Sequence, residues 1–100
     1  ANNTTVDITS KNLYSAFTLT ESSAVIALAK AATNALNLSP KLTSTGGGSD
    51  ANYFNTYNVP CAVLGIGMQK VHTNEEFILL EDLYNNAKLI CEIIKTAPYL

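Results

Sequence analysis

Charge is scarce in this sequence of 100 residues. Asp, Glu, Lys and Arg together make up 14% of it, and they leave a formal net charge of −2. The six basic residues are scattered and form no stripe of the kind that binds phosphate backbones or anionic lipid surfaces. The composition therefore gives no support to a partner such as nucleic acid or a membrane. A chain so poor in charge is instead expected to have part of its surface covered by other protein.

Long hydrophobic runs are also missing. The longest one, residues 61–68, is far shorter than the roughly 20 apolar residues that a membrane-spanning helix needs. Residues 1–5 have neither the charged region nor the apolar region of a signal peptide. We therefore expect a cytoplasmic protein.

Residues with reactive side chains are few. His72 is the only histidine, and no serine lies in the Gly-x-Ser-x-Gly setting of a nucleophile. The two cysteines, Cys61 and Cys91, form no Cys-x-x-Cys or other metal-binding pattern. We interpret them as reduced, buried residues of a cytosolic protein, although their spacing leaves a disulfide open.

Hydrophobic periodicity predicts a small α/β unit. Residues 4–10 alternate between apolar and polar side chains, which favours a strand, and residues 11–20 read as a connector. After residue 20 the predicted order is α-β-α-β-α, with a helix over 21–36, a strand over 41–44, a helix over about 50–57, a strand over 61–66 and a helix over about 80–97. Strands separated by helices pair in parallel. Two strands alone leave open edges, so we expect further strands to come from chain outside this sequence.

The first candidate site is the Gly-rich loop, residues 43–50, which joins a predicted strand to a predicted helix. Its glycines, at 46, 47 and 48, allow backbone N–H groups to converge near a helix start, where a carboxylate or phosphate could bind. No Gly-Lys-Ser/Thr sequence follows, so the loop is not a phosphate-binding P-loop. Local chemistry alone favours a plain flexible turn.

The second candidate is the His72 loop, residues 67–76, in which Glu75 and Glu76 follow the histidine. A single histidine beside two carboxylates can ligate zinc, but a zinc site needs three or four ligands, and an isolated surface histidine usually has no such role. Both loops follow predicted strands. They are therefore expected at the carboxyl edge of a parallel sheet, where ligands bind in open α/β folds.

Four stretches around these loops resemble the C-terminal part of the M20 zinc metallopeptidases, and the peptidase T-like branch in particular. They are Thr45–Asn52, Asn58–Cys61, Leu64–Thr73 and Glu75–Ile78. The likeness covers most of residues 14–96. The two loops together are specific for the family, whereas either alone would be weak.

The resemblance implies part of a two-domain enzyme. Residues 1–14 look like the last strand of a lid domain that usually mediates homodimers, and residues 15–100 look like the C-terminal part of a catalytic domain with a parallel sheet. The family's catalytic domain carries two zinc ions and hydrolyses a peptide bond of a short peptide with a zinc-activated water. The partners implied are the peptide substrate, a second copy and the remainder of the same polypeptide.

The same resemblance assigns site residues. His72 corresponds to the last zinc ligand, and the Gly47-Gly48-Ser49 segment to a loop that receives the substrate's carboxylate or carbonyl end. Asp50 corresponds to a structural position that supports this loop. The family's His-x-Asp pair, bridging aspartate, paired glutamates and lid arginine have no match here, so this chain alone is predicted to be inactive. Leu79 stands where relatives often carry a helix-capping serine.

Two other functions stay open at this point. The chain could come from a non-catalytic relative that serves as a carboxylate-binding or dimerising module. It could also be a free-standing small α/β domain, although the open sheet edges argue against that.

Overall fold

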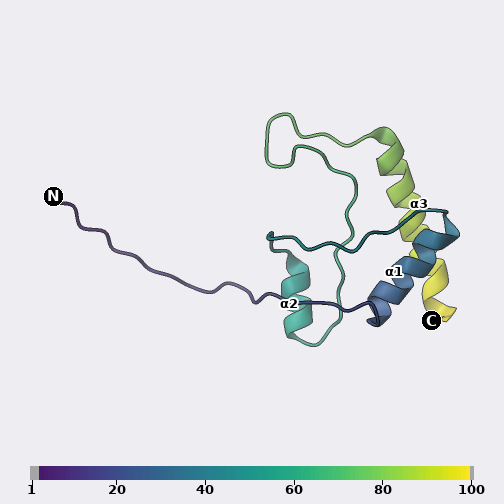
Figure 1. Cartoon of the computed structure of the whole chain (residues 1–100), viewed down its shortest axis with the longest axis horizontal. Helices are drawn as coiled ribbons and strands as arrows, with labels where there is room; N and C mark the ends of the chain where they lie inside the picture. Colours follow the sequence, from purple (N-terminus) through teal and green to yellow (C-terminus); the bar gives the residue numbers. More distant parts are fainter. Residues whose placement is uncertain (1–2, 100) are drawn as a thin grey trace.

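The computed structural model describes residues 3–99, and in this range it contains three α-helices joined by long irregular segments (Figure 1). The helices are α1 (Ala24–Ala35), α2 (Asp50–Thr56) and α3 (Leu80–Thr96), and a single 3₁₀ turn, η1 (Ala97–Tyr99), follows α3. Ala1 and Asn2, which the predicted lid strand includes, and Leu100 lie outside the described residues. All three predicted helices are thus confirmed to within a few residues.

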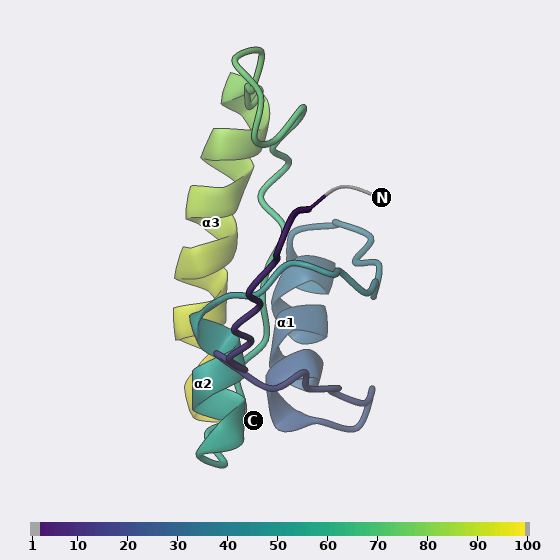
Figure 2. The same cartoon turned by 90° about the vertical axis from the view of Figure 1, so that its left-hand side faces the viewer.

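The centre of the molecule is the contact between α1 and α3, which lie side by side in both views (Figures 1 and 2). Ile26 and Ala32 of α1 and Leu89 of α3 are buried there. Thr33 is buried as well, and its hydroxyl donates to the carbonyl oxygens of Ala29 and Lys30, at 2.8 and 3.0 Å. Its polar group is therefore satisfied within α1.

The start of α1 differs from the prediction, which placed it at residue 21. Ser23 is the N-cap residue, with extended backbone angles. The Thr20 N–H donates to the Ser23 hydroxyl at 3.1 Å, and the Ser23 N–H donates to the Thr20 carbonyl at 3.0 Å. Because of this turn, α1 begins at Ala24, three residues later than predicted.

A capping box begins α2. Ser49 is the N-cap residue, and its N–H donates to the side-chain oxygen of Asn52 at 2.9 Å. The helix ends before Asn58, which adopts a left-handed φ of 59° that asparagine tolerates well. The side chain of Asn55 binds the segment after the helix at Cys61. Its amide nitrogen donates to the Cys61 carbonyl at 2.8 Å, and its oxygen accepts from the Cys61 N–H at 3.2 Å.

The predicted strands are not confirmed. Residues 4–10, 41–44 and 61–66 run as irregular traces, and within residues 3–99 the only β-pairing is an isolated antiparallel bridge between Gln69 and Phe77. A strand is defined by hydrogen bonds to a neighbour. None of these segments has a neighbouring strand in the described part of the chain.

The chain is open rather than compact. Its radius of gyration is 18.4 Å, against about 13 Å for a globular domain of this size. Residues 3–12 project away from the helices (Figure 1), and Ile8 is 85% exposed. The cysteines are free, as predicted, but Cys91 is exposed and Cys61 only half-buried, so their predicted burial is wrong. No helix in residues 3–99 has both the length and the apolar character that crossing a bilayer demands.

Candidate functional site

The Gly-rich loop leads into α2, and its three glycines differ in their surroundings. Nothing lies within 4 Å of a side chain added at Gly46, and one added at Gly47 would make an ordinary contact, 3.7 Å from the Thr45 hydroxyl. A side chain added at Gly48 would overlap the ring of Tyr14. None of the three has a left-handed φ. The steric need for glycine is therefore confined to Gly48.

The other two residues predicted at this loop lie at the helix start. Ser49 is the N-cap of α2, and Asp50 is the first residue of the helix, where its carboxylate faces the positive end of the helix dipole. The cap itself is made by Ser49 and Asn52, so Asp50 takes no part in the capping hydrogen bonds.

The His72 loop is a tight turn between Gln69 and Phe77. The bridge between these two residues closes it, with N···O distances of 2.8 and 3.2 Å. Both Lys70 and His72 adopt left-handed backbone angles, with φ of 51° and 63°. Histidine tolerates this region better than most residues, but the conformation still costs free energy. Residues in such conformations are found most often at functional sites.

The two carboxylates beside His72 have different partners within the loop. Glu76 accepts a hydrogen bond from the His72 N–H at 2.8 Å, and Glu75 pairs with Lys70 at 2.7 Å. The imidazole of His72 is exposed at the turn. The one histidine is thus exposed to solvent on a loop in which Glu76 holds its backbone N–H.

These residues fit one metal ligand but not a whole metal site. Within residues 3–99 no group of three or more His, Cys, Asp or Glu side chains lies close enough to hold an ion. A zinc ion needs three or four ligands. His72 can therefore contribute to a site only if other chain supplies the remaining ligands.

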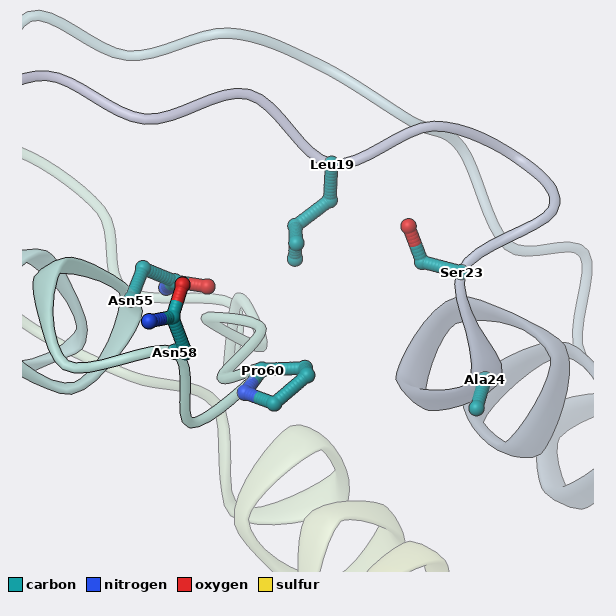
Figure 3. A pocket seen from close by; sticks show the side chains of 6 residues that line it. All are labelled: Leu19, Ser23, Ala24, Asn55, Asn58 and Pro60. Carbon is teal, nitrogen blue, oxygen red and sulfur yellow. The ribbon is translucent and has the colours of Figure 1, made fainter.

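The two loops are not brought into contact. Both follow the irregular segments that were predicted as strands, but within the described residues no hydrogen bond joins them. A hollow of about 330 Å³ lies elsewhere, between α2 and the start of α1, and Figure 3 shows its lining. It is formed by Leu19, Ser23, Ala24, Asn55, Asn58 and Pro60. None of the predicted site residues lines it.

An exposed ion pair links α1 to the residues just before it. The hydrogen bond from Lys30, 2.7 Å away, and its positive charge lower the pKa of Glu21. Both side chains are well exposed to solvent, so this pair contributes little to stability.

The sequence reasoning missed a set of contacts behind the Gly-rich loop. Tyr14, Asn52 and Tyr53 connect the segment before α1 to α2 and to Gly48. The only hint in the sequence is an asparagine three residues after a capping serine, a pattern that also occurs in ordinary helix starts.

Comparisons with known proteins agree on the class of this chain. Residues 4–96 match the sequence profile of peptidase family M20/M25/M40. The matched range includes all three helices and both loops. The chain belongs to peptidase family M20/M25/M40, and its resemblance to the peptidase T-like branch is confirmed by two solved structures.

These two structures are similar over most of the chain. One is the aminopeptidase PepT from Bacillus cereus, 34% identical with a TM-score of 0.77, covering 81% of this chain and 22% of that one. The other is a tripeptidase from Staphylococcus aureus, 33% identical with a TM-score of 0.81, covering 87% and 23%.

Curated relatives match over a similar share. An uncharacterized protein, YqjE, from Bacillus subtilis is 31% identical over 85 residues, which are 85% of this chain and 23% of that protein. An uncharacterized metallohydrolase of Methanocaldococcus jannaschii is 43% identical over 70 residues, 68% of this chain and 17% of that protein. The chain thus spans a quarter or less of the length of the relatives it matches.

Proposed function

We propose that this chain is the C-terminal part of a dizinc aminopeptidase that hydrolyses short peptides. The observation that carries the proposal is the geometry of His72: an exposed imidazole on a left-handed residue whose N–H is fixed by Glu76. Residues held in such sparsely populated backbone conformations cluster at functional sites. The likeness to an aminopeptidase and a tripeptidase supports the choice of substrate.

In this proposal, His72 holds one of two zinc ions together with ligands from the upstream chain. The metal, when bound, activates a water for attack on the peptide bond. Gly47, Gly48 and Ser49 receive the substrate's carboxylate or carbonyl end, and Asp50 supports their loop from the first turn of α2. The fragment alone is inactive, because it brings one metal ligand and none of the general bases that the family uses.

The proposal extends to the architecture. Residues 1–14 form the last strand of a lid domain that mediates a cytoplasmic homodimer, and residues 15–100 belong to the catalytic domain. Residues 41–44 and 61–66 become strands of its parallel sheet once neighbouring strands are present. Each of these segments needs a partner for its backbone groups, which the family's upstream chain would supply.

The exposed face of α3 is evidence that the main partner of this chain is the remainder of the polypeptide. This face carries an apolar stripe with helical spacing, formed by Leu80, Leu83, Ala87, Ile90 and Ile94, and all five residues are exposed. Leu89, on another side of the helix, already packs against α1. An apolar stripe of this size that stays exposed marks a surface that other protein covers.

The proposal is tested in the full-length gene product by replacing His72 with asparagine and with alanine. Asparagine tolerates the left-handed backbone, so His72→Asn separates loss of the ligand from loss of the turn. We expect both variants to lose tripeptide hydrolysis and about one zinc ion per chain while they keep the wild-type circular dichroism spectrum. Asn74→Ala in the same loop is the control. Wild-type turnover in His72→Asn would refute the role.

Metal content also distinguishes the second candidate, a non-catalytic carboxylate-binding or dimerising module. A gene product that lacks a His-x-Asp pair and paired glutamates upstream, and that binds no zinc, would favour the module. The Gly-rich loop at the start of α2 is the feature that such a module would retain.

A further inference from the structure

The crossing segment, residues 13–15, is tied to α2 by two side chains. The Tyr53 hydroxyl donates to the Leu13 carbonyl at 2.9 Å, and the Asn52 amide donates to the Ser15 carbonyl at 2.9 Å. Residues 13–15 precede α1 in the chain, yet they are anchored to the helix that follows the Gly-rich loop. Figures 1 and 2 both show this segment running beside α2 before it reaches α1.

Asn52 joins the crossing segment to the loop through a single buried amide. Its nitrogen donates to the Ser15 carbonyl, and its oxygen accepts from the N–H of Ser49, the N-cap residue of α2, each at 2.9 Å. Asn52 is 7% exposed. Residues 15 and 49 are therefore linked through two hydrogen bonds of one buried side chain.

Tyr14 adds a second connection. Its ring meets the ring of Tyr53 edge-on, with centroids 6.4 Å apart and planes at 66°, and its tip lies over Gly48. Gly48 has no left-handed backbone angle, so the overlap with the Tyr14 ring is what excludes a side chain there. Tyr14 thus occupies the space that the absent side chain of Gly48 leaves.

We propose that Tyr14 and Asn52 are positioning residues that set the Gly-rich loop according to the path of the crossing segment. The role of the loop in holding the substrate's carboxylate or carbonyl end rests on the proposed function. In that proposal, residues 13–15 are the point where the lid strand enters the catalytic domain. Through Asn52 and Tyr14, these residues hold the Gly-rich loop in place. The placement of the lid and the shape of the substrate loop are then coupled through one amide and one aromatic ring.

The decisive measurement is hydrogen exchange of the backbone amides of residues 43–50 in the full-length gene product. Tyr14→Ala removes the ring. Asn52→Asp keeps an oxygen that accepts from Ser49 but loses the donor to Ser15, so it cuts only the connection to the crossing segment. We expect both variants to exchange about tenfold faster in residues 43–50, because local opening becomes easier. Gly46→Ala, which meets nothing within 4 Å, should exchange like the wild type. Unchanged exchange in both variants would overturn the proposal.

A double-mutant cycle tests the contact between Tyr14 and Gly48. Gly48→Ala displaces the ring, so adding Tyr14→Ala to it should produce little further change in exchange. Fully additive effects would show that Gly48 is glycine for another reason and would refute this contact. Tyr14→Phe, which keeps the ring, should restore most of the wild-type protection.

Kinetics separate this inference from the proposed function. If the loop binds the substrate, Tyr14→Ala and Asn52→Asp should raise KM for a tripeptide about tenfold or more with a smaller change in kcat, since misplaced binding groups weaken the complex. A wild-type protein without peptidase activity, combined with faster loop exchange in the variants, would refute the proposed function and leave the positioning role intact. Unchanged exchange together with normal peptidase activity would do the reverse.

Discussion

At the scale of single residues, the His72 loop shows how much of a candidate metal ligand's position is set by its backbone. Two left-handed residues, Lys70 and His72, turn the chain, and Glu76 accepts the His72 N–H at 2.8 Å. A charged acceptor makes this bond stronger than a neutral one. Within the described residues, the hydrogen bond that Glu76 makes to His72 is therefore to the peptide group of the histidine and not to its ring.

Glu76 is consequently expected to matter for metal binding although it holds no metal itself. Glu76→Ala in the full-length gene product should weaken zinc affinity by about tenfold or more, as the loss of a supporting hydrogen bond does around other zinc sites. Glu75→Ala is the matched control, because it removes only an exposed ion pair with Lys70. Competition titration with a chelator measures both. Equal effects of the two variants would contradict the prediction.

At the scale of elements, α3 begins without a cap. Leu79 occupies the N-cap position, makes no side-chain hydrogen bond there and is half exposed, while Glu81 and Asp82 in the first turn offset part of the loss through the helix dipole. This agrees with the interpretation of Leu79 as a departure from the capping serine of relatives.

Leu79→Ser should therefore stabilise α3 by about 1 kcal/mol, because the serine hydroxyl can accept a hydrogen bond from the first turn. The expected result is slower hydrogen exchange in the first turn of α3 and a higher helix content by circular dichroism. Leu79→Ala removes the same apolar side chain without adding a cap, and it should show neither gain. Similar behaviour of the serine and alanine variants would argue that Leu79 is not a capping position.

The helices could be predicted from the sequence because their signals are local. Ser49 caps α2, and Asn58 ends it, as their side-chain chemistry and backbone tolerance require. The strands could not be confirmed in the same way. Val6 and Ile8 alternate as a strand does, but a ladder needs a second strand, and within residues 3–99 these residues have none.

The side by which α3 packs against α1 could not be predicted from the sequence, because that too depends on neighbouring elements. Periodicity predicts an apolar face that includes Leu83 and Ile90, and the structure places that face outward while Leu89 packs on α1. Which part of an apolar surface is covered depends on the neighbouring elements, not on the helix. In the candidate site, likewise, the sequence indicated His72 and the Gly-rich loop, but the hydrogen bond from Asn52 to Ser15 joins residues 37 positions apart, a separation over which no local pattern acts.

At the scale of the whole molecule, the hydrophobic core is as small as expected for one part of a larger protein. Among the residues whose burial is described, 3–98, four apolar ones are buried, namely Ile26, Ala32, Ala51 and Leu89. That is too little hydrophobic burial to offset the conformational entropy of ordering the chain. The stability of the fold is therefore expected to come from contacts with the rest of the enzyme.

The isolated 100-residue chain should in consequence self-associate. Sedimentation velocity is expected to show species that grow with concentration, because the outward face of α3 exposes a contiguous apolar stripe. Ile90→Lys, on that face, should reduce the association, whereas Asn34→Lys places the same charge on the exposed side of α1 and should not. A monodisperse monomer that unfolds cooperatively would instead support a free-standing domain.

The arm formed by residues 3–12 gives the molecule a mechanical property. The arm has one firm attachment near the body, at residues 13–15, and that attachment is to α2 through Asn52 and Tyr53. Tension applied to the arm therefore reaches α2 and the loop in front of it before it reaches α1, although α1 comes first along the chain. A pulling force on the arm would therefore be resisted first at α2, by two hydrogen bonds and by the contact between the rings of Tyr14 and Tyr53.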